Sequence, residues 1–220
     1  MPVFVFDEIG LAEISKHNPL KVLHSLLEVD NRDIAFVGIS NWRLDASKMN
    51  RALYLARPDP DEEDLIFTAI SIYNSICPGM RANETLIKNL ARAYYDLKDY
   101  FKVNKPEYTD FYGLRDFYHL IKQVSKELAN NNFEDVKEIV KVAKRAIERN
   151  FGGKIKAVEK FGEFLMNRHE IQDIYPYIES ENVLDLVRIN LEDKDSRYLM
   201  LICRPDVATY ILEKQFRESI

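Results

Sequence analysis

Two adjacent carboxylates follow an apolar segment close to the beginning of the sequence. Val3 to Phe6 are all apolar, and Asp7 and Glu8 come directly after them. At the end of a buried strand, an aspartate can hold the water shell of a Mg²⁺ ion and a neighbouring glutamate can polarise a water molecule for attack on a phosphate. A solvated loop carries the same two residues just as readily. The neighbours that the fold brings to Asp7 and Glu8 therefore decide between phosphate chemistry and an ordinary loop.

The second candidate is Asn41, which follows the apolar run Ile34 to Ile39. Both apolar runs are nearly continuous, a pattern typical of parallel strands that are buried on both faces. Ligands of open α/β sheets bind outside the carboxyl ends of the strands, so we expect Asn41 to lie at the same sheet edge as Asp7 and Glu8. There an asparagine can orient an attacking water or contact a terminal phosphate. By itself it is equally typical of a turn.

Two arginines are the remaining candidates. Arg51 lies in KMNRALYLARP, ten residues beyond Asn41, and Arg115 begins a helical segment in DFYGLRD. A guanidinium is planar and permanently charged, which suits it to the charge that develops on a transferred phosphate. Most single arginines are solvated, and Arg57 and Arg92 are candidates for that reading. Spacing leaves open whether Arg51 or Arg115 acts in its own subunit or on a neighbour.

The phosphate-binding half of a nucleotide site is missing from this pattern. No G-x-x-x-x-G-K-[ST] loop occurs in the 220 residues. That loop supplies the backbone N–H groups and the lysine that bind most of the phosphate charge. The sequence thus carries acidic, polar and arginine candidates for nucleotide hydrolysis without the loop that cradles the nucleotide.

The composition is that of a packed, acidic globular protein. Hydrophobic residues make up 46% and aromatic residues 11%, which is ample for a buried core. The formal charge of −5 and the pI near 5.5 argue against a nucleic-acid-binding surface. Cys77 and Cys203 form no C-x-x-C, which excludes a zinc ribbon, a RING or a disulfide scaffold within these residues. With no signal peptide and no apolar run near the ~20 residues that span a bilayer, we expect a cytoplasmic protein without a transmembrane segment.

The first sixty residues predict a β-α-β unit. Val3 to Phe6 and Ile34 to Ile39 are its strands, and an Asn-Pro pair at 18–19 begins a helix of about ten residues between them. Asp45 is the expected N-cap of a further short helix. Leu53 to Ala56 is a third strand candidate.

From Pro58 onward the periodicity is helical. Apolar residues recur at three- and four-residue spacing, and Asp, Asn, Pro and Gly residues mark starts and ends. A late apolar run favours a strand, followed by an amphipathic helix after Pro205. The predicted elements are a helix capped within Asp59 to Asp64 and running through Tyr73, helices at Asn83 to Val103, Leu114 to Ala129, Phe133 to Arg149, Ile155 to Arg168 and Val183 to Asn190, and a strand at Arg197 to Cys203.

Other chemistry-bearing residues have simpler interpretations. His24 and Glu28 share one helix face and His17 is near them, yet a metal site lacks a third ligand at useful spacing. Trp42 is expected to anchor the core or an interface, and stacking on a nucleotide is the lesser alternative. We expect the Tyr and Phe residues between 94 and 118 to pack helices together, and a platform for peptides or bases is the lesser alternative.

The order of the candidates resembles that of the AAA+ ATPases, in which Walker B, sensor 1, an arginine finger and sensor 2 follow one another. Longer strings are similar to the mysterin-type, dynein-like AAA+ ubiquitin ligases, namely DEIGLAE, NPLKVLHSLLE, AFVGISNWRLDASKMNRA, FYGLRDFYHLIK, AIERNFGG and SRYLMLI. The resemblance runs through almost the whole chain. Its most specific part is GISNW-x-LD-x-x-KMNR followed by FYGLRD.

This resemblance implies a role for each candidate. Asp7 coordinates Mg²⁺ through water, and Glu8 activates the attacking water. Asn41 is sensor 1, Arg51 is the finger that serves the nucleotide of the adjoining module, and Arg115 is sensor 2. The implied cofactors are ATP and Mg²⁺, with Asp7, Asn41 and Arg115 on the cofactor-binding side.

The implied fold class is α/β: a partial AAA+ P-loop NTPase parallel sheet that lacks the Walker A strand, followed by a mostly α-helical lid and linker. In the AAA+ strand order the phosphate-loop strand lies between the sensor 1 strand and the strand after it. The strands at Ile34 to Ile39 and Leu53 to Ala56 should therefore lie on either side of a gap, or close incorrectly, and expose edges that favour aggregation. The implied domains are the C-terminal half of the α/β subdomain at 1–60, the helical lid with sensor 2 at 61–130, a helical linker at 131–195 and the start of the next AAA+ module at 196–220.

The resemblance also implies an activity and partners. The activity is ATP binding and hydrolysis by one AAA+ module of a giant ubiquitin-protein ligase, and these residues alone are expected to be inactive because Walker A is absent. The partners are adjoining AAA+ modules of the same chain and the ubiquitin machinery, which would act through zinc-binding regions that these residues lack. A non-hydrolysing AAA+-like scaffold or interaction module is the alternative from another class.

Overall fold

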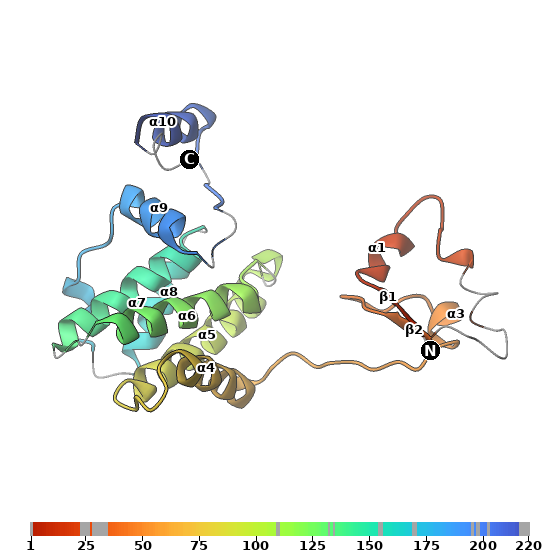
Figure 1. Ribbon diagram of the computed structural model, residues 1–220, viewed down its shortest axis with the longest axis horizontal. Coiled ribbons are helices and arrows are strands. Elements are labelled where there is room, and N and C mark those ends of the chain that lie inside the picture. The colour runs from red at the N-terminus through yellow and green to blue at the C-terminus, as the bar shows by residue number, and fades with distance from the viewer. Residues whose placement is uncertain are drawn as a thin grey trace. The chain divides into compact units, whose positions relative to one another are not determined.

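The computed structural model places a small sheet in one part of the chain and a group of packed helices in the other (Figure 1). Unit 1 comprises Met1–Asp59, and unit 2 comprises Pro60–Ile220. The residues that the structure describes are 2–22, 27, 35–108, 111–131, 133, 135–153, 156–168, 171–194, 196, 199–201 and 203–215.

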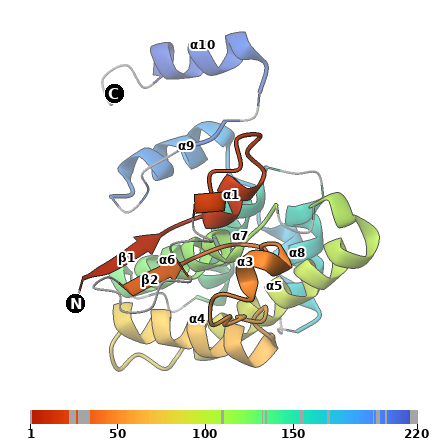
Figure 2. The ribbon, with the colours of Figure 1, turned by 90° about the vertical axis from the view of Figure 1, so that its right-hand side faces the viewer.

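Unit 1 contains two parallel strands in its described part (Figure 2). The strands pair in register, with Phe6 opposite Gly38. The predicted parallel pairing of the two apolar runs is therefore confirmed. The elements of this unit are β1 (Val3–Phe6), α1 (Ile9–Glu13), β2 (Ala35–Gly38) and α3 (Ala46–Met49).

Local hydrogen bonds explain where α3 begins. Asp45 is its N-cap, as predicted, and the carboxylate accepts hydrogen bonds from the backbone amides of Ser47 and Lys48 over 2.8 and 3.2 Å. These two amides belong to the first turn of the helix and have no partner within it. The predicted helix after the Asn-Pro pair at 18–19 lies largely outside the described residues.

Two apolar runs that were predicted as strands are not strands. Residues 53–56 have no strand structure, and Leu53 and Leu55 are 89% and 83% exposed. Residues 199–201 and 203 of the later run have none either. A strand is stabilised by hydrogen bonds to a neighbouring strand, and within the described residues β1 and β2 have no third partner. An apolar run without such a partner remains irregular, so the prediction at 53–56 was wrong, and the prediction at 197–203 was wrong for the four residues that the structure describes.

The sheet is also less buried than its sequence predicts. Val3, Phe4 and Val5 are more than half exposed, although consecutive residues of a strand point to opposite faces. Both faces of β1 are therefore open in the described part of unit 1. An apolar run reports what a strand can bury, and the elements that cover it decide whether burial occurs.

Unit 2 is built from helices packed in layers. Within it α4 packs on α5 and α6, α6 packs on α7, and α8 packs on α5 and α7. Its elements are α4 (Glu62–Ile76), α5 (Glu84–Asn104), the 3₁₀ turn η1 (Pro106–Tyr108), α6 (Leu114–Asn130), α7 (Val136–Phe151), α8 (Ala157–Met166), η2 (Tyr175–Tyr177), α9 (Val183–Glu192) and α10 (Pro205–Gln215). In the part of the chain that the structure describes, no helix is both long enough and apolar enough to cross a membrane.

The helix boundaries of unit 2 follow from local chemistry. Asp61 caps α4 by accepting a 2.8 Å hydrogen bond from the amide of Asp64, whose side chain bonds back to the amide of Asp61. Gly152 follows the last residue of α7, and glycine suits this position because a Cβ there would lie 2.5 Å from the carbonyl oxygen of Glu148. Both ends agree with the predicted boundary signals.

Aromatic side chains form the centre of unit 2. Tyr94 and Phe117 stack with ring centroids 4.6 Å apart, and both are completely buried. The ring of Phe151 lies 5.0 Å from that of Tyr112 and 4.9 Å from that of Phe161. These rings therefore pack helices together, as predicted.

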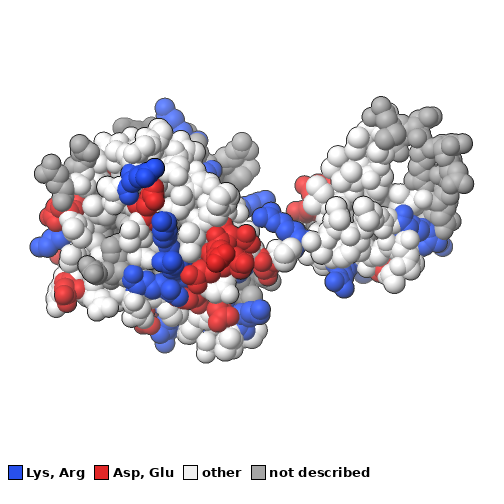
Figure 3. Space-filling view, turned by 90° about the horizontal axis from the view of Figure 1, so that it is seen from below, with Lys and Arg blue, Asp and Glu red and all other residues white. Residues whose placement is uncertain are grey.

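The surface of unit 2 carries mixed charge. On the face shown in Figure 3, Lys and Arg side chains lie beside Asp and Glu side chains instead of forming one basic field. Arg168 pairs with Asp96 over 2.8 Å, and Arg92 pairs with Glu62 over 3.2 Å. Arg92, expected to be solvated, is thus a partly exposed ion-pair residue.

Candidate functional site

The carboxyl ends of β1 and β2 lie at the same edge of the sheet because the strands are parallel and in register. Past the last ladder pair, the amide of Ile39 donates to the carbonyl of Phe6 over 3.0 Å. Asp7 and Glu8 leave the sheet after the first strand, and Asn41 lies three residues after the second. The structure thus brings these three residues to one edge, and the chemical role of each stays a prediction.

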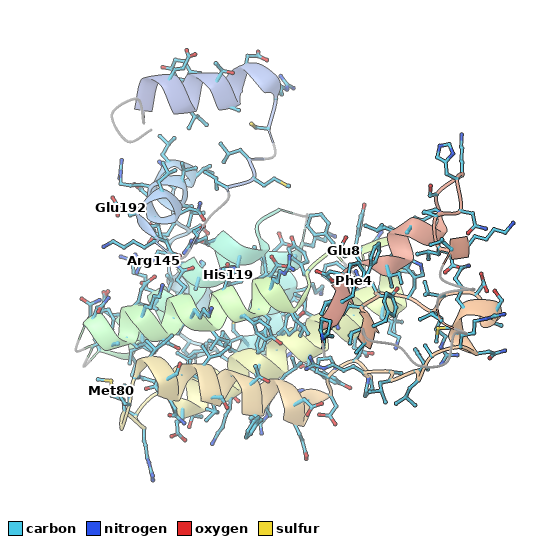
Figure 4. All side chains as sticks on the ribbon, turned by 45° about the vertical axis from the view of Figure 1, so that its right-hand side comes forward. Phe4, Glu8, Met80, His119, Arg145 and Glu192 are labelled. Atoms are coloured by element: carbon cyan, nitrogen blue, oxygen red, sulfur yellow. The ribbon has the colours of Figure 1, made fainter. Side chains whose placement is uncertain are left out.

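Glu8 has an unusual backbone conformation. Its φ of 52° and ψ of 36° lie in the left-handed region, which costs a residue with a side chain on the order of 1 kcal/mol. Its amide donates to the Asp7 carboxylate over 2.9 Å, and the next residue, Ile9, is buried. Glu8 is itself exposed, at the point where β1 ends and α1 begins (Figure 4). The chain therefore turns sharply from β1 into α1 at Glu8, the residue predicted to activate water.

The loop after β2 folds against the first turn of α1. A Cβ on Gly10 would lie 2.5 Å from the Ser40 hydroxyl and 2.7 Å from the Trp42 ring, so only glycine allows this approach. The Ser40 hydroxyl in turn donates to the Trp42 carbonyl over 2.6 Å. Asn41, between them, is therefore held near the beginning of α1. Trp42 packs on this helix as an anchor while remaining 44% exposed.

Three charged residues connect α1 with α3. The ammonium group of Lys48 pairs with the Glu13 carboxylate over 2.9 Å and also with the Asp45 carboxylate. These hydrogen bonds raise the pKa of Lys48, and the bonds from Lys48 and Ser47 hold the pKa of the Asp45 carboxyl well below its usual value. Lys48 and Asp45 are therefore both charged at neutral pH.

Arg51 lies just beyond α3 and is half-buried. Its guanidinium donates to the carbonyl oxygen of Ser47, one turn earlier in the chain. That carbonyl belongs to the short helix that Asp45 caps. The position of Arg51 thus depends on α3.

Arg115 is the second residue of α6 and belongs to unit 2, whereas the other candidates belong to unit 1. It is exposed. The helix start beside it is well defined, because the carboxylate of Asp116 accepts a 2.9 Å hydrogen bond from the amide of Gly113. Burial raises the pKa of Asp116. The sensor 2 role of Arg115 stays a prediction.

The donors at the sheet edge fit Mg²⁺ bound together with a nucleotide. Magnesium prefers oxygen ligands and usually takes one or two carboxylates, with waters and substrate phosphates completing its shell. Asp7 and Glu8 offer such carboxylates, and the described residues contain no cluster of three His, Cys, Asp or Glu that could hold a metal alone. Of the residues considered for an alternative metal site, His17 is exposed, and His24 and Glu28 lie outside the described residues.

Glu13 and Lys48 were not singled out from the sequence. Lys48 is one of 31 basic residues, and no local pattern distinguishes it. Its side chain is only 9% exposed, which is rare for lysine unless the charge is paired. The one local signal was the expected cap at Asp45, and its contact with Glu13 depends on the fold.

Comparison with known proteins finds a matching family and several relatives of the chain. A family model described as RNF213 AAA domain matches residues 1–64. The chain is 36% identical over 224 residues to E3 ubiquitin-protein ligase rnf213-beta of Danio rerio, which covers 96% of this chain and 4% of that protein. It is 34% identical to E3 ubiquitin-protein ligase RNF213 of Homo sapiens over 240 residues and of Mus musculus over 241, in each case 99% of this chain and 4% of the relative. No solved structure matches.

These matches extend beyond the sheet. The family model ends in α4, yet the relatives align with nearly the whole chain, so the helices of unit 2 belong to the same conserved segment. The chain spans about 4% of the length of the relatives. The expected resemblance to AAA-type ubiquitin ligases is confirmed: residues 1–64 match the RNF213 AAA domain family, and nearly the whole chain aligns with one segment of RNF213-type E3 ubiquitin ligases.

Proposed function

We propose that this chain supplies the acidic and sensor side of an AAA+ site that binds and hydrolyses ATP within a larger ubiquitin ligase. The observation that supports this most directly is the parallel pairing of β1 with β2 in residues that match the RNF213 AAA domain family. That pairing puts Asp7, Glu8 and Asn41 at one sheet edge, where nucleotides bind to open α/β sheets.

The two carboxylates have different tasks in this proposal. Asp7 holds a water of the Mg²⁺ shell, and Glu8 takes a proton from the water that attacks the terminal phosphate. An Mg²⁺ ion held through Asp7 would supply positive charge to offset the negative charge that develops on the phosphate. The left-handed backbone at Glu8 supports the assignment, because strained residues cluster at functional sites.

The remaining candidates act on the phosphate or on its water. Asn41 orients the attacking water as sensor 1, and the loop packed on Gly10 keeps it near Glu8. Arg51 is the arginine finger that reaches the nucleotide of the adjoining module. Arg115 is sensor 2 on the helical lid. Their charge and donor geometry suit a phosphoryl group that carries developing negative charge.

The proposed domain organisation is that of the same AAA+ module. Residues 1–60 are the later half of the α/β subdomain with its Walker B strand, 61–130 the lid, 131–195 a linker and 196–220 the start of the next module. The partners are the adjoining modules of the same mysterin-type chain and, through regions outside these residues, the ubiquitin machinery. We place the protein in the cytoplasm.

The test replaces the matched region of the Danio rerio relative with this chain and compares Glu8→Gln with the unchanged chimera. A glutamine keeps the shape of Glu8 but cannot accept the proton, so the module should retain ATP unhydrolysed, with catalysis at that site slowed about 100-fold or more. The measurement is the number of ATP and ADP molecules bound per chain after incubation with Mg²⁺ and ATP. Glu107→Gln, at an exposed position in η1, is the matched control.

An increase of one retained ATP per chain in Glu8→Gln alone supports the proposal. An unchanged ATP to ADP ratio contradicts the role of Glu8. The competing function, a non-hydrolysing AAA+-like scaffold, is favoured by one sequence observation, the lack of a phosphate loop in these residues. It predicts that the chimera still folds and that neither Glu8→Gln nor Glu107→Gln changes the amounts of ATP and ADP bound per chain.

A further inference from the structure

We infer that Glu13, Lys48 and Asp45 form a positioning cluster that holds Asn41 and Arg51 in a defined place relative to Glu8. The inference rests on the proposed function for the roles of those three residues. The cluster itself is defined by contacts within unit 1.

Glu13 lies at the opposite end of α1 from Glu8. It is the last residue of α1, and Glu8 is the N-cap of the same helix. A helix of five residues is about 7.5 Å long and transmits the orientation of one end to the other. Any contact that holds Glu13 therefore also restrains the turn at Glu8.

Glu13 contacts the segment that contains Asp45 and Lys48. One carboxylate oxygen, Oε1, accepts hydrogen bonds from the amide of Asp45 over 3.0 Å and from the ammonium group of Lys48 over 2.9 Å. These donors lie 32 and 35 residues away, on the segment that follows β2. Two separate parts of the chain are thus joined at one oxygen atom.

The helix α3 connects Asp45 and Lys48 with Arg51. Asp45 caps α3, and its side chain also binds Lys48 in the first turn. Arg51 contacts the carbonyl of Ser47 in the same helix. The cluster therefore lies between the residue that activates water and the residue that reaches the next module.

Burial distinguishes the pair of Lys48 with Glu13 from an ordinary surface ion pair. The Lys48 side chain is nine-tenths buried, and the second oxygen of Glu13, Oε2, is buried without a hydrogen-bond partner in the described part of the chain. A buried carboxylate tolerates this only when its charge is compensated. Exposed ion pairs do not constrain a backbone in this way, because solvent competes for both groups.

The test uses the 220-residue chain and its single tryptophan. Trp42 packs on Gly10, so its accessibility reports whether the loop carrying Asn41 stays on α1. Trp42 is 44% exposed, and complete release would raise its acrylamide quenching constant about twofold. Lys48→Met and Glu13→Gln should each approach this value. Lys16→Met, at an exposed site beyond α1, should not change quenching.

Two further variants separate positioning from loss of folding. Lys48→Arg keeps the charge and should restore wild-type quenching. The double variant Glu13→Gln with Lys48→Met should quench no more than either single variant, because both remove the same joint. Wild-type quenching in Lys48→Met, or effects of the two substitutions that add, would overturn the cluster.

The link to catalysis is measured in the chimera with the Danio rerio relative. Lys48→Met should lower kcat for ATP at least tenfold with KM for ATP unchanged, and Lys48→Arg should restore it. An unchanged kcat beside increased Trp42 quenching overturns the positioning role. If the unchanged chimera does not hydrolyse ATP, the proposed function fails, whereas the quenching result still decides whether the cluster exists.

Discussion

The backbone amide of Ile9 donates a hydrogen bond of 2.9 Å to the carbonyl oxygen of Ile39. This bond joins the start of α1 to the end of β2, after the strand ladder itself has ended. It lies between the two polar segments of the candidate site, one residue after Glu8 and two before Asn41. Main-chain hydrogen bonds therefore hold the sheet edge as far as Ile39, and side-chain substitutions beyond it can test chemistry and packing separately.

Gly10→Ala should destabilise unit 1. The added Cβ overlaps the Trp42 ring and the Ser40 hydroxyl, and overpacking of this kind costs about 1–3 kcal/mol, against a helix-propensity gain of about 1 kcal/mol. Urea unfolding followed by Trp42 fluorescence measures the change. Gly38→Ala is the control, because its Cβ would make ordinary contacts of 3.4 Å and longer. Equal stabilities of the two variants would contradict the close packing at Gly10.

Tyr112→Phe should destabilise the core of unit 2 by roughly 1–3 kcal/mol. The Tyr112 hydroxyl donates to the carbonyl oxygen of Phe151 over 2.7 Å, and that carbonyl lies in the last turn of α7, where helical partners are lacking. Chemical unfolding monitored by circular dichroism at 222 nm checks this. Tyr95→Phe, at a partly exposed position on α5, should stay within about 0.5 kcal/mol of the wild type.

Arg149→Met should release α9 from the rest of unit 2. Arg149 is 10% exposed and donates to Asn190 over 3.0 Å and to Asp193 over 2.9 Å. Apolar packing contributes less to holding α9, because Val187 is the one residue of this helix that is buried. Removing one partner of a nearly buried pair costs up to about 3 kcal/mol, and here that loss falls on one helix. Hydrogen exchange of residues 183–192 should accelerate while α4 remains protected.

Arg188→Met is the matched control for that experiment. Arg188 is also on α9, but it pairs with Asp185 at the surface over 2.8 Å, with 56% of its side chain exposed. Such a pair contributes little. Equal exchange of α9 in Arg149→Met and in the wild type would show that packing, and not the polar contacts, holds this helix.

Alkaline pH should weaken unit 2. Burial raises the pKa of Cys77 above its ordinary 9.0, and burial also raises the pKa values of Tyr73 and Tyr175 above 10.0. These groups stay neutral in the folded state, so their contribution to stability is complete below pH 9 and is lost as pH rises from there. The free energy of urea unfolding should therefore fall between pH 9 and pH 11. Cys77→Ala should flatten the first part of this decline, and Cys203→Ala, at an exposed thiol, should leave it unchanged.

Helix ends were predicted where one side chain satisfies a nearby amide. Asp45 and Asp61 cap the helices expected of them, because a cap and its acceptor lie two or three residues apart. The start of α7 was placed at Phe133, whereas the helix begins at Val136 after the cap Asp135. Several polar residues precede that helix, and only the structure selects which one turns toward the amides.

The strand predictions show the opposite case. Within the runs at 3–6 and 34–39 the structure has strands at Val3–Phe6 and Ala35–Gly38, whereas the equally apolar run at 53–56 was not a strand. Composition is similar in all three. A strand requires a partner at a distant position in the sequence, and composition carries no information about whether that partner is present.

The sequence by itself determined the candidate residues, the family resemblance and the positions of most helices, because motifs and caps depend on neighbours a few residues apart. Tertiary structure decided that Phe6 lies opposite Gly38, that Trp42 packs on Gly10, and that Lys48 is buried between Glu13 and Asp45. Apart from the local pair of Lys48 with Asp45, these contacts join residues more than 30 positions apart. Their geometry follows from strand register and close packing, which no local spacing in the sequence specifies.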